Sequence, residues 1–144
     1  MRKWQGIILH HSATKDSGTV SWDAIREYHT KEKGWSDIGY HCGLEYVGDK
    51  IVFQPGRSLD LDGAGCVGKN STHIQICIVG DFDAVEPTDE MYKEVAHVCK
   101  RFMDLYGFGM VDIRGHFAYA PKKTCPGKLF NWLKLSAYIG EMTK

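Results

Sequence analysis

Short apolar segments alternate along this chain with amphipathic helical segments, and this alternation restricts the fold more than any other feature of the sequence. The segments 6–11 (GIILHH), 73–80 (HIQICIVG) and 111–116 (VDIRGH) have the length and composition of strands. Residues 40–47 and 50–56 flank a Gly-Asp turn and predict a β-hairpin. Strands interleaved with helices predict an α/β fold, in which a mixed central β-sheet is flanked by α-helices.

Three segments have the pattern of helices that pack on such a sheet. The clearest is 87–107, in which apolar residues recur every three or four positions, Thr88 can cap the start and a glycine ends the pattern. A second helix is predicted over residues 21–33, with Ser21 as its cap. The tail from Pro126 alternates apolar and polar residues and predicts a closing helix.

Length and charge indicate one domain without a general affinity for nucleic acids or membranes. We expect residues 1–144 to form a single domain, since the chain is long enough for one core but not for a second module. Lys and Arg balance Asp and Glu, 18 against 18, so the electrostatic footprint of a nucleic-acid binder is missing. No apolar stretch approaches the about 20 residues of a membrane span. The apolar part of the opening MRKWQGIILHHS is too short for a signal peptide, so we expect none. We expect cytoplasmic synthesis, a monomer, and no nucleic-acid or membrane partner.

The five cysteines do not have the pattern of a disulfide framework or of a cysteine-rich structural zinc site. Their number is odd and none are spaced as C-x-x-C. Cys77 in a predicted strand and Cys99 in a predicted helix fit buried apolar positions. Cys125 differs, because it lies in the proline-bounded loop HFAYAPKKTCPG that begins at His116.

Two histidines and Cys125 form a candidate metal site. Side chains alternate across a strand, so His10 and His11 point to opposite faces and only one of them can serve a given site. Two histidines and one cysteine would supply three zinc ligands and leave the fourth position to water, as in catalytic zinc sites. Alternatively, His10 is a hydrogen-bonded strand end, and Cys125 is a buried thiol or a nucleophile paired with His116. The residues alone leave these alternatives open.

A resemblance to a known family favours the metal site. The motifs ILHHSAT, KGWSDIGYH, GRSLDLDGAG, NSTHIQICIVGDFD and RGHFAYAPKKTCPG occur in this order over nearly the whole chain. Together they resemble the zinc-dependent N-acetylmuramoyl-L-alanine amidases of the phage T7 lysozyme type, which are related to peptidoglycan recognition proteins. The resemblance implies the fold of that group and places the zinc ligands at His10, His116 and Cys125.

The resemblance also implies two catalytic residues. The tyrosine of the G-Y-H motif falls on Tyr40, and a lysine two places before the cysteine falls on Lys123. The loop from His116 to the cysteine is one residue longer than in the T7 enzyme, so counting forward from the histidine selects Lys122 instead. We favour Lys123, because the metal fixes the cysteine and its close neighbours most tightly. His41 should point away from the side that Tyr40 faces and is expected to be a supporting residue.

The chain departs from the family pattern at two further places. Gly65 stands where many relatives have a histidine, and His73-Ile74-Gln75 replaces the usual S-I-G. These departures concern contacts with the peptide stem of the substrate and leave the three expected zinc ligands unchanged.

The resemblance implies a zinc hydrolase that cleaves the amide bond between N-acetylmuramic acid and L-alanine in peptidoglycan. The expected role is that of a phage or prophage endolysin, which acts on the cell wall after release. One alternative is a cytoplasmic amidase that recycles muropeptides. Another is a binding module that recognises peptidoglycan without cutting it, although Cys125 argues against this because non-catalytic relatives typically lose that ligand. A third is a metal-free thiol hydrolase that uses Cys125 and His116.

Overall fold

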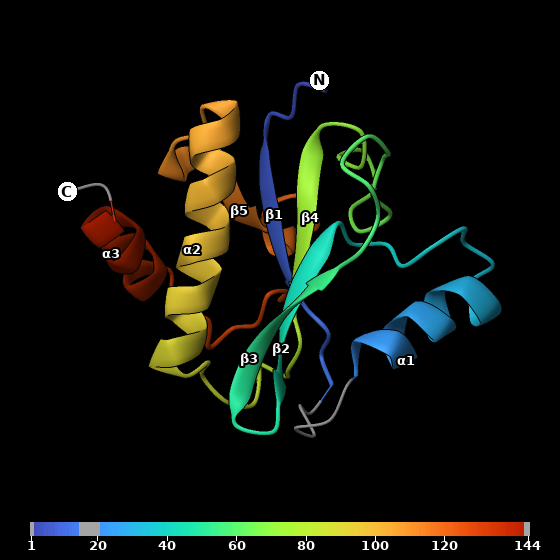
Figure 1. Ribbon diagram of the computed structural model, residues 1–144, viewed down its shortest axis with the longest axis horizontal. Helices are drawn as coiled ribbons and strands as arrows, with labels where there is room; N and C mark the ends of the chain where they lie inside the picture. Colours follow the sequence, from blue (N-terminus) through green and yellow to red (C-terminus); the bar gives the residue numbers. More distant parts are fainter. Residues whose placement is uncertain (1, 15–20, 143–144) are drawn as a thin grey trace.

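Within the part of the chain that the structure describes, a mixed sheet of five strands, in the order β3-β2-β4-β1-β5, forms the centre of the molecule (Figure 1). The computed structural model describes residues 2–14 and 21–142. The strands are β1 (Gly6–His11), β2 (Cys42–Val47), β3 (Lys50–Pro55), β4 (His73–Ile78) and β5 (Ile113–Gly115). β1 runs parallel to both β4 and β5, and β2 pairs parallel with β4 and antiparallel with β3. The predicted α/β fold with a mixed sheet and a hairpin is confirmed.

In residues 2–14 and 21–142, three α-helices flank the sheet, and α2 and α3 pack against each other on one side of it (Figure 1). They are α1 (Trp22–Glu27), α2 (Asp89–Tyr106) and α3 (Trp132–Met142), and a π-helical turn, Tyr28–Glu32, continues α1. The ends of α2 are as predicted: the Thr88 side chain accepts a hydrogen bond from the backbone N–H of Met91, and Gly107 adopts a left-handed conformation with φ 77°.

The predicted start of α1 is confirmed, whereas the predicted start of the closing helix was wrong. Ser21 occupies the N-cap of α1, but its side chain makes no capping hydrogen bond. The carboxylate of Glu45 instead accepts from the backbone N–H groups of Ser21 and Trp22, at 2.7 and 3.1 Å. The closing helix begins at Trp132 and not at Pro126.

The segment before α3 is not helical because its backbone hydrogen bonds go elsewhere. Gly127 has φ 119°, a conformation outside the helical region. The backbone N–H groups of Lys128 and Leu129 donate to Asp83 and to the Phe82 carbonyl, so they connect this segment to the loop after β4. The third predicted strand is also shorter than expected, since 3₁₀ turns at Met110–Asp112 and His116–Ala118 flank β5.

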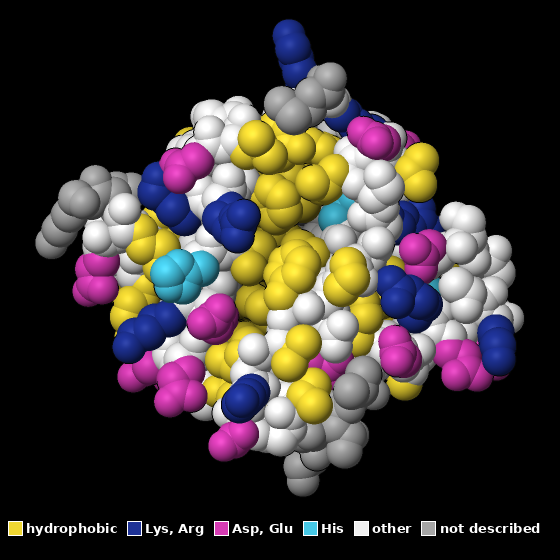
Figure 2. All heavy atoms as spheres, viewed as in Figure 1, with side chains coloured by type: hydrophobic (Ala, Val, Ile, Leu, Met, Phe, Trp, Pro, Cys, Tyr) yellow, Lys and Arg dark blue, Asp and Glu magenta, His cyan; other side chains and the backbone are white. Residues whose placement is uncertain are grey.

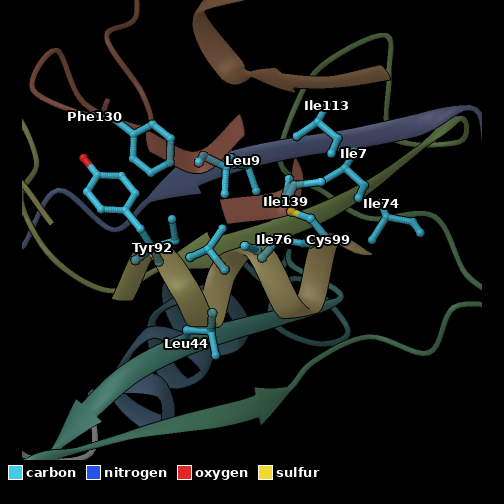
Figure 3. Packing of buried hydrophobic residues seen from close by; sticks show 14 of the residues in the cluster. Ile7, Leu9, Leu44, Ile74, Ile76, Tyr92, Cys99, Ile113, Phe130 and Ile139 are labelled. Atoms are coloured by element: carbon cyan, nitrogen blue, oxygen red, sulfur yellow. The ribbon is translucent and has the colours of Figure 1, made fainter. Parts of the chain in front are cut away.

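Strand alternation separates the hydrophobic core from the functional face of the sheet. Ile7 and Leu9 of β1 and Ile74 and Ile76 of β4 pack towards α2, where Tyr92 and Cys99 meet them (Figure 3); these residues belong to one buried cluster. Cys77 belongs to a second cluster with Trp22 of α1. The side chains that alternate with the core residues, His10 on β1 and Gln75 on β4, are therefore available to the opposite face.

The five cysteines are free thiols. Cys77 and Cys99 are buried as predicted, and Cys42 and Cys66 are buried as well. On the face shown in Figure 2, Lys and Arg are interspersed with Asp and Glu around a central band of hydrophobic side chains. Among the described residues, none of the helices combines the length and hydrophobicity needed to cross a bilayer.

Candidate metal centre

The pairing of β1 with β5 brings His10 and His116 together from distant parts of the sequence. The two strands are parallel, and Leu9 lies opposite Gly115 in their register. His10 follows Leu9 and His116 follows Gly115, so both imidazoles lie at the same end of the two adjacent strands. Their ring centroids are 4.8 Å apart.

Cys125 reaches the histidines because the loop after β5 folds back on itself. The backbone N–H of Phe117 donates to the Cys125 carbonyl at 3.0 Å, which closes the loop. The Cys125 Sγ accepts a hydrogen bond from the backbone N–H of His11 at 3.3 Å. The same sulfur lies 3.6 Å from Nδ1 of His10. One nitrogen from each of His10 and His116, together with this sulfur, fall within 4.8 Å of one another.

Asp83 anchors this loop, a role that the sequence analysis missed. Its two carboxylate oxygens accept from the Thr124 hydroxyl at 2.8 Å and from the backbone N–H of Lys128 at 2.9 Å. These two hydrogen bonds, first that from Lys128, lower the pKa of the Asp83 carboxyl. One feature of the sequence could have indicated this role: Asp83 lies just after a buried strand, at the same edge of the sheet as His10.

The three donors fit a zinc ion in type and in spacing. Neutral imidazole and thiolate are ordinary zinc ligands, and a nitrogen and a sulfur bound to one tetrahedral zinc lie about 3.6 Å apart. This is the separation between His10 Nδ1 and Cys125 Sγ. Burial lowers the pKa of His10 to about 3 and raises that of Cys125 to about 12. The imidazole is therefore neutral at pH 7, as a ligand must be, and the thiol gives up its proton when a metal binds.

His11 takes no part in this cluster. Its side chain points to the other face of the sheet, where Nδ1 accepts from the backbone N–H of Phe82 at 3.0 Å and the two rings stack. His10, the first histidine of the pair, is the one that lies beside His116 and Cys125.

Tyr40 lies beside His10, at 5.2 Å between ring centroids, and packs against the buried cluster that contains Cys77. Burial, followed by the nearby thiols, raises the pKa of Tyr40 well above its ordinary value, so its hydroxyl is protonated at neutral pH.

Lys123 is exposed and its charge acts on two of the candidate ligands. Burial is the largest influence on the pKa values of His116 and Cys125, and the ammonium group of Lys123 lowers both. His41, in contrast, is buried in a supporting position: its Nδ1 accepts from the backbone N–H of Gln75, and its Nε2 lies 2.9 Å from the Leu61 carbonyl.

Comparison with known proteins identifies the family. The sequence model of the family described as "N-acetylmuramoyl-L-alanine amidase" matches residues 1–128. The chain belongs to this amidase family. The enzyme therefore cleaves the amide bond that joins N-acetylmuramic acid to L-alanine in peptidoglycan, as the resemblance predicted.

Two phage endolysins are similar to the amidase over most of their length. The endolysin of Enterobacteria phage K11 is 33% identical over 137 residues, which cover 92% of this chain and 87% of the relative. The endolysin of Escherichia phage T7 is 32% identical over 123 residues, which cover 83% of this chain and 78% of the relative.

Solved structures confirm the fold and the predicted relation to peptidoglycan recognition proteins. The amidase LysC from Clostridium intestinale has a TM-score of 0.80 at 22% identity, over 96% of this chain and 87% of that one. Drosophila peptidoglycan recognition protein LB has a TM-score of 0.78 at 25% identity, over 90% of this chain and 79% of that one.

Three histidines make the stability of the amidase sensitive to acid. Each accepts a backbone N–H at Nδ1 and cannot be protonated there without losing that bond. The acceptors His11, His29 and His41 pair with the amides of Phe82, Gly39 and Gln75. Burial is the largest cause that lowers the pKa of all three. Below about pH 6.5 the unfolded state therefore binds more protons than the folded state, and the unfolding free energy falls as the pH falls.

We expect the urea midpoint of the metal-free protein to be lower at pH 5.5 than at pH 7.5. His41 is buried and its pKa is lowered, so it contributes to this loss. The variant His41→Asn keeps an acceptor without the titration and should show a shallower dependence on pH. Equal midpoints at the two pH values for the unmodified protein would contradict this explanation.

Proposed function

We propose that this amidase is a zinc-dependent endolysin whose metal ligands are His10, His116 and Cys125. The observation that carries the proposal is the convergence of two imidazole nitrogens and one thiol sulfur within 4.8 Å, at the end of two adjacent parallel strands. Three protein ligands leave one tetrahedral position open, which is the arrangement of a catalytic zinc rather than of a structural one. The similarity to endolysins supports the biological role.

The bond to be cut is an unactivated amide, which requires a strong nucleophile and stabilisation of the charge that develops on the carbonyl oxygen. When bound, zinc lowers the pKa of a coordinated water to about 7 and polarises a carbonyl as a Lewis acid. The protein contributes the geometry. The hydrogen bonds from Thr124 and Lys128 to Asp83 hold the loop that carries Cys125. The pairing of β1 with β5 fixes the two histidines relative to each other.

Tyr40 and Lys123 are proposed to act directly on the reacting groups. The hydroxyl of Tyr40 can donate a hydrogen bond that orients the attacking water or the substrate carbonyl. Its raised pKa keeps it protonated at neutral pH, so it is not available as a base. The ammonium group of Lys123 is exposed and close enough to the ligands to influence them, so it can stabilise the tetrahedral oxyanion.

The variant Tyr40→Phe is expected to lower kcat by about 10- to 100-fold while zinc content stays the same, because only one hydroxyl is lost beside the site. The rate of release of peptide from purified peptidoglycan measures the effect. Tyr28→Phe removes an exposed hydroxyl from another tyrosine and should leave the rate unchanged. Activity of Tyr40→Phe within twofold of the unmodified enzyme would remove Tyr40 from the mechanism.

The experiment that tests the proposed function is mass spectrometry of digested peptidoglycan, with and without a strong chelator. We expect free stem peptides that begin with L-alanine, loss of the reaction with chelator, and its return when zinc is added. Activity that survives chelation but is lost on thiol alkylation would indicate the metal-free thiol mechanism. Binding of peptidoglycan without product would indicate a recognition module.

The cellular role is tested by the choice of substrate. We propose that the protein is one amidase domain that works as a monomer and acts on the cell wall after release from the cytoplasm. An endolysin should degrade intact sacculi and lyse permeabilised cells. An enzyme that cleaves soluble muropeptides but leaves intact sacculi unchanged would be a recycling amidase instead.

A further inference from the structure

The glutamine at position 75 lies directly behind the candidate metal ligand His10. Gln75 belongs to β4, the strand next to β1, and is fully buried. Its Oε1 lies 2.6 Å from Nε2 of His10, on the side of the imidazole ring away from Cys125. A buried polar side chain of this kind needs a specific partner, because an unpaired amide would cost free energy.

The orientation of the Gln75 amide is fixed by its other contact. The amide Nε2 donates to the backbone carbonyl of His73 at 3.2 Å, and a carbonyl can only accept. The remaining amide atom, Oε1, therefore faces His10 and accepts from it. The backbone on either side is held as well, since the N–H of Gln75 donates to Nδ1 of His41 at 3.0 Å.

This hydrogen bond determines which nitrogen of His10 is free to bind a metal. Because Gln75 Oε1 accepts, Nε2 of His10 must carry the proton. Nδ1 then has the free lone pair, and it is the atom that faces Cys125 Sγ at 3.6 Å. In the opposite tautomer, Nδ1 would carry a proton between itself and Cys125 Sγ. Nε2 would then face Gln75 Oε1 without a proton, so two acceptors would meet.

The glycine at position 65 provides the space that this arrangement needs. A Cβ atom at Gly65 would lie 2.7 Å from Oε1 of Gln75 and 2.9 Å from Nε2 of His10, closer than real contacts allow. Glycine at position 65 therefore leaves the space that the Gln75 amide and the His10 ring occupy.

We propose that Gln75 is a positioning residue for the metal centre, which holds His10 in the tautomer and ring orientation that present Nδ1 to the zinc. The proposal rests on the proposed zinc function, because it assigns a role toward the same ion. Partners of this kind tune metal affinity, and their removal typically costs 10- to 100-fold in binding.

The test is zinc affinity, measured by competition with a chromophoric chelator, for the unmodified enzyme and for Gln75→Met. Methionine keeps the length of the side chain and removes the acceptor. We expect zinc to bind about 10- to 100-fold more weakly to this variant, with a changed absorption spectrum when Co²⁺ replaces zinc. Gln54→Met is the matched control, because it removes an amide hydrogen bond to Glu45 in the same sheet and should leave zinc affinity unchanged. An affinity of Gln75→Met within twofold of the unmodified enzyme would overturn the proposal.

Two further measurements keep the test decisive. Gln75→Glu retains an oxygen acceptor and should bind zinc within about fivefold of the unmodified enzyme. Nitrogen-15 NMR of the metal-free protein reports the tautomer of His10 directly: a proton on Nε2 supports the proposal, and a proton on Nδ1 contradicts it, even if Gln75→Met fails to fold. An unmodified enzyme that binds no zinc would refute the proposed cofactor, and the tautomer measurement would still decide the role of Gln75.

Discussion

Replacing Cys125 by serine is expected to remove bound zinc from the purified amidase and to lower its activity by on the order of 10³-fold or more. A serine hydroxyl is not among the ordinary protein ligands of zinc, so only two ligands would remain. Elemental analysis of the gel-filtered protein and release of stem peptide from peptidoglycan measure the two effects. The loop should keep its conformation, since Asp83 holds it through neighbouring residues.

The control for this variant is Cys42→Ala. Cys42 is a buried free thiol in the hydrophobic core, so its replacement should reduce stability by about 1 kcal/mol and leave zinc and activity in place. If Cys125→Ser kept one zinc per chain and most of its activity, Cys125 would not be a ligand.

Replacing Lys123 by alanine is expected to lower kcat/KM by about 10²- to 10³-fold, the size of effect seen when one group that stabilises an oxyanion is removed. Zinc content should not change, since Lys123 acts on the ligands through its charge and is not one of them. Both Lys122 and Lys123 are exposed, so neither substitution should affect folding.

The neighbouring lysine provides the control for this prediction. Counting residues from His116 or from Cys125 selects different lysines, and only the kinetics of both variants can assign the role. Lys122→Ala should remain within about threefold of the unmodified enzyme, as expected for a solvated surface charge. A large loss in Lys122→Ala with a normal Lys123→Ala would reverse the assignment.

Sequence patterns predicted the elements of the fold well where hydrophobic periodicity and capping agree. The helix α2 illustrates this, because its apolar positions, Thr88 and Gly107 all indicate the same boundaries. The prediction failed for 126–131, where periodicity suggested a helix but long-range hydrogen bonds to the loop after β4 set the backbone. Such contacts leave no trace in a local pattern.

The candidate site was reachable from the sequence only through the family resemblance. The residues alone allowed a zinc site or a thiol pair, because nothing local joins His10 to His116. Their proximity depends on the pairing of β1 with β5, and strand order is a property of the whole sheet. Alternation along β1 did separate His10 from His11 correctly. The position of Gln75 behind His10 could not be predicted, since it required the register of β1 against β4.

The most direct measurement of the central claim is X-ray absorption at the zinc edge of the purified, unmodified amidase. A ligand set of His10, His116, Cys125 and one solvent oxygen predicts a single sulfur at about 2.3 Å and three nitrogen or oxygen neighbours at about 2.0 to 2.1 Å. A zinc shell without sulfur, or with more than one, would contradict the site proposed for this enzyme.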